Sequence, residues 1–233
     1  MSFTERTEIL IGKKGIEKLQ SSHIAVFGVG GVGGYACEML VRTGIGEITI
    51  IDFDTVAMSN INRQIVALTS TVGKLKVDVF KNRLLDINPN LKVNVFPIKF
   101  CEENIDLIFN KHYDYVVDAI DDLDNKILLI KTCHDKNIKI VSAMGAGNRC
   151  DIPSFEVADV YKTYNDGLAK LIRKRLRSVG VEKHNVVFTK SVSQPKSHIV
   201  GSISYYPPMC GCTLSAFVIN ELLKGIVDND WRN

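Results

Sequence analysis

The chain has 233 residues, of which 45% are hydrophobic and 24% are charged, and a formal net charge of +3. Such values are typical of a globular protein with one domain, or one domain and a subdomain, around a large core. The total charge is too small to indicate nucleic-acid binding by itself. No segment reaches the roughly 20 apolar residues that span a membrane. The first residues lack the apolar stretch of a signal peptide, so we expect a cytoplasmic protein whose six cysteines are reduced.

Helix and strand patterns alternate along most of the chain. After a lead-in helix over residues 8–19, strands are predicted over 24–27, 47–51, 92–96, 115–119 and 139–142, and helices over 33–43, 74–87, about 104–110 and 125–136. Short apolar strands between helices predict a parallel sheet with helices on both faces. We therefore expect an α/β fold, with a Rossmann-like doubly wound and mostly parallel sheet.

The alternation changes after residue 147. Residues 151–194 combine a basic helix pattern with a polar loop, and a strand and a helix are expected from residue 199 onward. We interpret residues 151–198 as an insertion over the carboxyl edge of the sheet, where doubly wound folds bind ligands. Residues 1–233 would then form one domain, with a nucleotide-binding core over residues 22–147 and a C-terminal strand-helix extension.

A glycine-rich motif joins the first predicted strand to its helix. Its glycines are Gly28, Gly30, Gly31 and Gly33. The second strand ends in Asp52, with Asp54 two residues further on. Glycines allow a tight turn and a close approach of the backbone to phosphate, and an acid roughly 20 residues later bonds a ribose hydroxyl. The motif predicts a nucleotide site in which Asp52 or Asp54 holds the ribose.

Two cations follow in polar surroundings. Arg63 is flanked by Asn60, Asn62 and Gln64, and Lys76 stands near the start of a predicted helix. An exposed arginine or lysine is usually a solvated side chain that contributes little. A lysine at the amino end of a helix opposes the helix dipole, however, unless it neutralises an anion. We predict that Arg63 and Lys76 face phosphate groups, with Asn60 and Asn62 in the same site.

Asp118 and Asp121 lie at the exit of an apolar strand, at the same edge of the predicted sheet. Paired carboxylates there suit Mg²⁺, which takes one or two protein carboxylates together with phosphate oxygens and waters. A helix N-cap at Asp121 or Asp122 is the simpler interpretation and is compatible with a metal site. Asn125 and Lys126 are expected to reach the same pocket.

From residue 6 to about residue 147, the chain resembles the ubiquitin-activating-enzyme-like ATP-dependent adenylyltransferases. That superfamily includes the activators of sulfur-carrier proteins for molybdopterin and thiamine. Its glycine loop, Asp, Asn-x-x-Arg-Gln, Gly-x-x-Lys and Asp-x-x-Asp motifs are matched by residues 28–33, 52, 60–64, 73–76 and 118–121. The resemblance implies that Gly31 meets the nucleotide, Asp52 the ribose, Arg63 and Lys76 the triphosphate, and Asp121 magnesium.

The same resemblance implies a homodimer. In this superfamily an N-terminal arginine reaches the ATP of the partner subunit, and Arg6 stands at the matching position. An exposed tail residue without such a role is the alternative.

Within the superfamily, nearly the whole chain resembles the tRNA threonylcarbamoyladenosine dehydratases. The matching stretches are residues 42–46, 62–68, 86–89, 118–126, 145–147, 159–163 and 168–170. This likeness implies ATP-dependent cyclisation of threonylcarbamoyladenosine in tRNA through an acyl adenylate, with ATP and Mg²⁺ as cofactors. The chain departs from the pattern at Cys210 and Cys212, where relatives carry a small apolar turn.

Two other functions stay open. One is adenylation of the C-terminal glycine of a ubiquitin-like sulfur carrier, by the same ATP residues. Many such activators hold zinc with two Cys-x-x-Cys pairs, whereas this chain offers Cys210 and Cys212 as Cys-x-Cys, so no structural zinc is expected. The other is a nicotinamide dehydrogenase or redox-sensing module, which would leave Arg63, Lys76 and Asp121 without a role.

A basic segment, residues 170–177, is the last candidate for a binding surface. Leu171, Ile172 and Leu176 would line one face of a helix and leave cations such as Arg173 and Arg177 on the other. A charge run on a helix is usually a solvated face. Contact with tRNA phosphates is the functional hypothesis. A sulfur-transfer partner protein also stays open, and no membrane partner is expected.

Overall fold

The computed structural model describes residues 2–194 and 200–227, and within them seven strands form one sheet in the order β3-β2-β1-β4-β5-β7-β6. The strands are β1 (His23–Phe27), β2 (Glu47–Ile51), β3 (Lys92–Phe96), β4 (Tyr115–Asp118), β5 (Ile140–Ala143), β6 (Phe155–Asp159) and β7 (Asn185–Thr189). Neighbouring strands run parallel except β6, which is antiparallel to β7. The predicted α/β class and the doubly wound, mostly parallel sheet are therefore confirmed.

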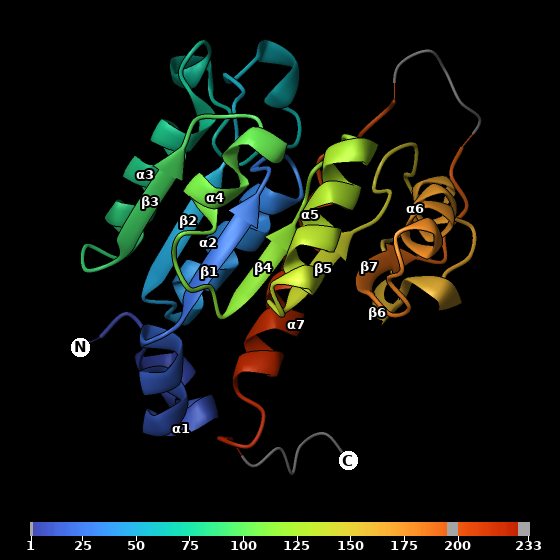
Figure 1. The fold of residues 1–233 in the computed structure, drawn as a ribbon. Coiled ribbons are helices and arrows are strands. Elements are labelled where there is room, and N and C mark those ends of the chain that lie inside the picture. Colours follow the sequence, from blue (N-terminus) through green and yellow to red (C-terminus); the bar gives the residue numbers. More distant parts are fainter. Residues whose placement is uncertain (1, 195–199, 228–233) are drawn as a thin grey trace.

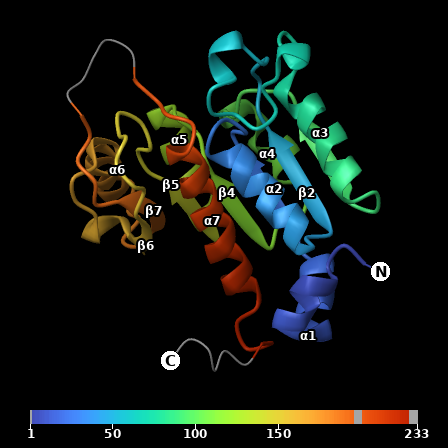
Figure 2. The same cartoon turned by 180° about the vertical axis from the view of Figure 1, so that it is seen from behind.

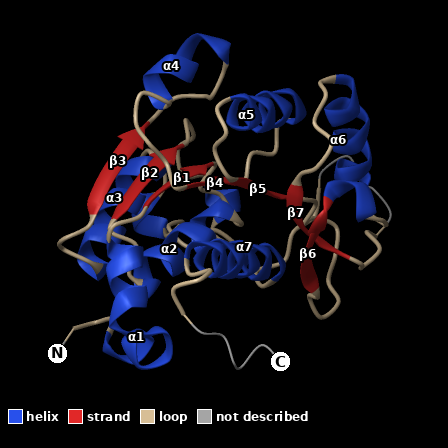
Figure 3. Cartoon of the chain, turned by 60° about the horizontal axis from the view of Figure 1, so that its bottom comes forward, coloured by secondary structure: helices blue, strands red, loops and turns tan. Residues whose placement is uncertain are grey.

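Helices cover both faces of the sheet. They are α1 (Glu5–Gln20), α2 (Gly33–Thr43), α3 (Lys76–Ile87), α4 (Ile105–Ile108), α5 (Leu123–Asp135), α6 (Gly167–Ser178) and α7 (Tyr206–Leu222). Figures 1 and 2 show α2, α3 and α7 on one face and α4, α5 and α6 on the other, and Figure 3 shows both layers edge-on. None of the described helices is long and apolar enough to cross a membrane.

The central strands are mostly apolar because both of their faces are buried. In β1, Ile24 and Val26 pack in the core shared with α2 and α7, whereas Ala25 and Phe27 pack in the core shared with α5. All five residues of β1 are buried. A continuous apolar run is the usual sequence of a parallel strand between two helix layers.

Several predicted boundaries shift. The lead-in helix α1 begins earlier, at Glu5, and runs through a kink at Gly12, whose φ is 69°. The helix predicted over about 104–110 is reduced to the single turn of α4 (Ile105–Ile108). These differences concern helix ends and short helices, where local signals are weakest.

The expected insertion over residues 151–198 needs correction. Its described part extends the sheet, because β7 pairs with β5 and β6 pairs with β7, while α6 joins the two strands. The sequence hides β6 because an edge strand need not be apolar, and Glu156 and Asp159 interrupt it. The strand expected from residue 199 is also wrong for the described residues 200–205, which form an irregular segment before α7. Residues 195–199 lie outside the described residues.

α2 and α7 approach each other closely at a glycine. A Cβ added to Gly211 would lie 2.2 Å from the carbonyl oxygen of Val32 and 3.0 Å from the amide nitrogen of Ala36. Such distances leave no room for a side chain. Glycine at position 211 therefore sets the spacing of the two helices that cover this face.

We predict that Gly211→Ala lowers the free energy of unfolding by about 1–3 kcal/mol, because the added methyl overpacks the α2–α7 contact. Gly167→Ala is the matched control, since no atom lies within 4 Å of a Cβ there. Alanine is compatible with the first turn of α6 and should leave stability equal or slightly higher. Urea unfolding measures both variants, and equal midpoints for the two would contradict the packing argument.

Candidate active site

A cavity of about 780 Å³ opens at the carboxyl edge of the sheet, between the loops after β1, β2 and β4. The chain passes outward from β1 to β2 and β3 and then returns to the other side of β1 as β4. The helices that follow β1 and β4 therefore cover opposite faces of the sheet, which leaves a crevice between them. Doubly wound sheets bind their ligands at such a switch point.

Asp52 ties the end of β2 to the glycine loop. Its carboxylate accepts hydrogen bonds from the backbone N–H of Val29 at 2.8 Å and of Asp54 at 2.9 Å. Burial raises the pKa of Asp52, while the charge of Lys76 and the two N–H groups oppose the rise. Each carboxylate oxygen has a second lone pair. The side chain of Asp52 can therefore fix the loop and still accept a hydrogen bond from a hydroxyl group of a ligand.

The glycine loop needs its glycines. Gly28 has a φ of 81°, and a Cβ there would lie 2.8 Å from the carbonyl oxygen of Ala119. A Cβ at Gly33 would lie only 1.9 Å from the carbonyl oxygen of Gly28. Gly30 and Gly31 line the cavity. The turn is thus too tight for a side chain at Gly28 and Gly33, and Gly30 and Gly31 present backbone to the cavity.

The two acids after β2 have different partners. Asp54 accepts a hydrogen bond from Lys76 at 2.7 Å, and the Lys76 side chain is only 5% exposed. Lys76 is the first residue of α3 and lines the cavity. An ammonium group has three N–H donors, so Lys76 keeps donors for a second anion. The structure thus joins Asp52 to the glycine loop and Asp54 to the cation.

Arg63 lies across the glycine loop. A Cβ added to Gly31 would meet the Cγ of Arg63 at 3.3 Å. The guanidinium donates to the carbonyl oxygen of Ser59 at 3.0 Å and to the Oδ1 of Asn62 at 2.8 Å. Asn60 lines the cavity and accepts from the N–H of Ala57, which fixes the preceding turn. The polar cluster around Arg63 therefore orients its charge.

Asn62 has a different position from the one predicted. It is not among the residues that line the cavity, and its Nδ2 donates to the carbonyl oxygen of Ser202 at 2.9 Å. Ser202 does line the cavity, as does Gln64. The Oγ of Ser202 and the Oε1 of Gln64 are buried without a hydrogen-bond partner in residues 2–194 and 200–227. Buried polar atoms of this kind are usually paired, so these two are suited to a ligand.

Asp118 and Lys126 lie behind the cavity wall, contrary to the prediction that they contact the nucleotide. Both side chains are 0% exposed and form an ion pair of 2.8 Å. Asp118 also accepts from the N–H of Ile120 at 3.0 Å, and neither residue of the pair lines the cavity. A buried charge needs a partner of opposite sign. The pair therefore holds the loop after β4 in place.

That loop carries the remaining predicted residues. Asp121 is exposed on the cavity wall, and Asn125 also lines it. Asp122 is the N-cap of α5, because its side chain accepts from the N–H of Asn125. The cap is therefore Asp122, which leaves the carboxylate of Asp121 free of that role.

Asp121 is the residue predicted to hold Mg²⁺. No group of three or more His, Cys, Asp or Glu side chains in the described part of the chain is arranged to hold a metal ion. Mg²⁺ commonly takes one or two protein carboxylates and completes its shell with phosphate oxygens and waters. The residues present fit an ion that arrives with a triphosphate.

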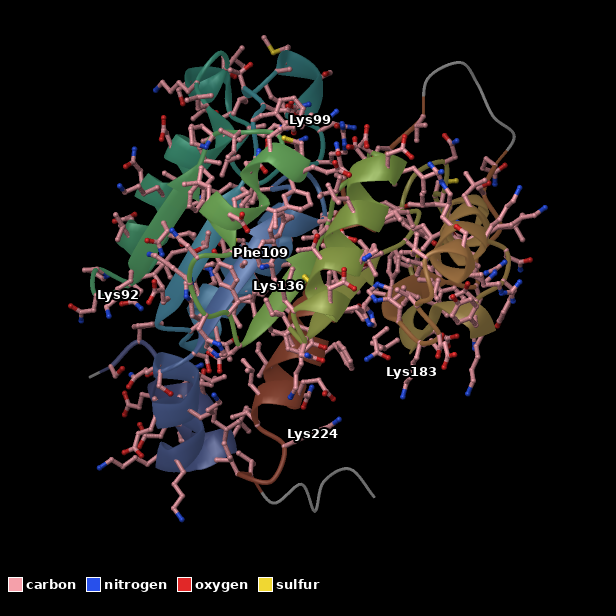
Figure 4. All side chains as sticks on the ribbon, viewed as in Figure 1. Lys92, Lys99, Phe109, Lys136, Lys183 and Lys224 are labelled. Carbon is pink, nitrogen blue, oxygen red and sulfur yellow. The ribbon has the colours of Figure 1, made fainter. Side chains whose placement is uncertain are left out.

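Lys99 was missed by the sequence analysis. It lies on the cavity wall, 3.6 Å from the carboxylate of Asp122, and Figure 4 shows it near the upper end of the molecule. Its signal was its position, shortly after the predicted strand 92–96, at the same edge as Asp52. Ser202 had no comparable signal, because only the fold brings it there.

Arg6 and the basic segment lie away from the cavity. Arg6 is exposed on α1, which packs near the amino ends of the strands, at the opposite end of the molecule (Figure 1). In α6, Arg173 donates to the carbonyl oxygen of Thr163, Arg175 pairs with Asp124, and the Arg177 guanidinium lies 5.2 Å from the ring centre of Tyr161. Three of the α6 cations thus already have partners within the chain.

We predict that Lys126→Met lowers the free energy of unfolding by about 3–5 kcal/mol, because it leaves the charge of Asp118 buried without a partner. Asp118→Asn combined with Lys126→Met should recover part of that loss, since the amide oxygen can still accept from Ile120. Chemical denaturation at pH 7 compares the two variants. A double variant less stable than Lys126→Met would contradict the role of the pair.

The chain has close relatives among known proteins. The ThiF family model matches residues 5–229. A tRNA threonylcarbamoyladenosine dehydratase from Bacillus subtilis is 39% identical over 95% of this chain and 94% of that protein. One from Escherichia coli is 42% identical over 77% of this chain and 67% of that protein. The crystal structure of E. coli tRNA N6-threonylcarbamoyladenosine dehydratase, TcdA, in complex with ATP superposes with a TM-score of 0.90 at 34% identity, covering 95% of this chain and 93% of that one. This chain therefore belongs to the ThiF family.

Proposed function

We propose that the chain is an ATP-dependent enzyme that cyclises threonylcarbamoyladenosine in tRNA. The observation that carries the proposal is the convergence of Arg63, Lys76 and Asp121 on the cavity beside the glycine loop. Two relatives with this function in their names are 39% and 42% identical to the chain, and TcdA has been crystallised with ATP and with AMP. A nicotinamide site would need no such set of charges around its phosphates.

Different residues of the site bind different parts of ATP. Asp52 holds the ribose from the end of β2, while the backbone of Gly30 and Gly31 approaches the phosphates. Arg63 and Lys76 neutralise the triphosphate. Asp121, with triphosphate oxygens, would hold Mg²⁺, which supplies further neutralisation of phosphate charge when bound. Preorganised charges of this kind stabilise the transition state without reorganising during the reaction.

The chemistry then needs no protein nucleophile. The threonyl carboxylate attacks the α-phosphate of ATP, pyrophosphate leaves, and an acyl adenylate forms. The carbamoyl group closes onto the activated carbonyl and expels AMP, so that the nucleoside loses the elements of water. Alignment of the carboxylate with the α-phosphate makes the attack effectively unimolecular.

Adenylation of a sulfur carrier is the second candidate. A molybdopterin-synthase adenylyltransferase from Haemophilus influenzae is 31% identical over 70% of this chain. Enzymes that transfer the activated carrier protein to one of their own thiols need a reactive cysteine. Burial raises the pKa of Cys210 and of Cys212, which makes both thiols poor nucleophiles at neutral pH. Adenylation itself needs no such thiol, and the tRNA substrate is better supported because the two relatives named for it are 39% and 42% identical to the chain, against 31% for the adenylyltransferase.

The assembly is part of the same proposal. Arg6 lies far from the cavity of its own chain, so it can act on ATP only across a homodimer. The exposed Lys170 and Lys174 of α6 are the cations best placed to contact tRNA phosphates, since their neighbours are engaged within the chain. We also propose a cytoplasmic location, in keeping with six free cysteines, and leave a sulfur-transfer partner open.

Incubation with ATP, Mg²⁺ and tRNA that carries threonylcarbamoyladenosine tests the function. Mass spectrometry of the nucleosides, digested under mild conditions, should show a loss of one water that requires ATP. An unchanged nucleoside mass, with ATP still bound by the protein, would contradict the proposed substrate and favour a protein carrier.

Arg63→Ala and Asp121→Ala should each reduce kcat by about 100-fold or more, because each removes a charge that stabilises the reacting phosphates. Both side chains lie on the cavity wall, so the urea midpoint should stay unchanged. Asp124→Ala is the control, since this acid is near Asp121 in sequence but does not line the cavity. Full activity of Arg63→Ala or Asp121→Ala would contradict the assigned role of that residue.

A further inference from the structure

The cavity has a second wall, which the proposed nucleotide ligands do not use. Residues 200–205, here called the strap, lie against the loop after β5 and lead into α7 (Figure 2). Val200 and Ser202 of the strap line the cavity. Asp52 directly follows β2, which stands three strand positions from β5 in the sheet. At roughly 4.8 Å per strand, β5 lies about 14 Å from β2 in the sheet.

The strap is held in one position. The N–H of Asn148 donates to the carbonyl oxygen of Gly201 at 2.8 Å, and the N–H of Gly201 donates to the Oδ1 of Asn148 at 2.6 Å. Asn148 has a φ of 56°, a conformation that asparagine tolerates better than most residues. At the α7 end, the hydroxyl of Tyr205 donates to the carbonyl oxygen of Cys150 at 2.6 Å. Residues on the strap are therefore preorganised.

The side-chain amide of Asn62 connects the strap to the part of the cavity wall that carries Arg63. The side chain of Asn62 donates to the carbonyl oxygen of Ser202 at 2.9 Å and accepts from the guanidinium of Arg63 at 2.8 Å. Ser202 and Arg63 are thus set relative to each other by a single planar group. A ligand that contacts both Ser202 and Arg63 would lie where the strap meets the part of the cavity wall that carries Arg63.

Ser202 brings to this junction a polar group that has no hydrogen-bond partner in the described part of the chain. Its Oγ is buried and lacks a hydrogen bond to any residue in the ranges 2–194 and 200–227. Leaving a buried hydroxyl unpaired costs stability, so the group needs a partner from a ligand. The residue lines the cavity, and a change of side-chain rotamer would turn its Oγ toward a ligand there. Besides accepting hydrogen bonds, a hydroxyl donates one. Ser202 therefore suits a ligand that carries an acceptor.

We propose that Ser202 binds the carboxylate that the enzyme activates, by donating a hydrogen bond that holds it against the α-phosphate of ATP. The inference rests on the proposed function and adds a residue for its acceptor substrate. The nucleotide has its own partners at the β1–β2 end of the cavity, whereas the strap borders the β5 side. A carboxylate offers only acceptors and is matched by a hydroxyl donor and a nearby cation.

The test compares Ser202→Ala with Ser202→Thr, and with Ser204→Ala as the matched control on the exposed side of the strap. Three quantities are measured: kcat/KM for cyclisation of the tRNA nucleoside, the Kd of ATP by calorimetry, and the urea midpoint. For Ser202→Ala we expect kcat/KM to fall about 10- to 100-fold, as for a lost hydrogen bond to a charged group. The Kd of ATP should stay unchanged, and the urea midpoint should be equal or higher, because an unpaired buried hydroxyl is gone.

Ser202→Thr keeps the hydroxyl and should retain kcat/KM within a few-fold of the wild type, as should Ser204→Ala. Wild-type kcat/KM in Ser202→Ala, or a parallel loss of ATP affinity, would overturn the inference while the proposed function stands. A lower urea midpoint for Ser202→Ala, with rates lost in proportion to folded protein, would also overturn it. Absence of turnover in the wild type would instead defeat the proposed function, and this inference with it.

Discussion

The hydrogen bond between the carboxylate of Asp52 and the N–H of Val29 connects the two parts of the fold on which the site depends. It joins the end of β2 to the loop after β1, at the point where the strand order reverses. Gly28 and Gly33 leave no room for side chains in the loop, and Val29 between them is buried in the core. The N–H of Val29 donates to Asp52, so this buried acid helps to fix the backbone that phosphate approaches.

The charges around the cavity are positioned by the protein itself. Lys76 is held by Asp54, Arg63 by Asn62, and the loop that carries Asp121 by the buried pair of Asp118 and Lys126. Such pairing places each charge before a ligand arrives, which is how a site avoids reorganisation during the reaction. Among the described residues that line the cavity, the Oγ of Ser202 and the Oε1 of Gln64 are exceptions, because they are buried without a hydrogen-bond partner. Departures from full pairing are expected at functional sites.

The core of the fold and the nucleotide motifs were predictable because they are local. The strands β1 and β2 are mostly apolar, and the glycine loop and Asp52 follow them directly. The edge strand β6 was not predictable, because Glu156 and Asp159 break its apolar pattern. The pairing of Asp118 with Lys126 and the placing of Ser202 depend on contacts between distant segments, which no local spacing encodes. Most of the predicted site residues line the cavity, whereas Asn62, Asp118 and Lys126 do not and instead contact other parts of the protein.

An isotope experiment tests the central claim, which is activation of the substrate carboxylate at the α-phosphate of ATP. tRNA with ¹⁸O in the threonyl carboxylate is incubated with the protein, ATP and Mg²⁺, and the masses of the products are measured by mass spectrometry. The account predicts one ¹⁸O atom in AMP for each nucleoside cyclised, because ring closure expels the carboxylate oxygen with the adenylate. Label in inorganic phosphate together with ADP, or in water, would contradict it.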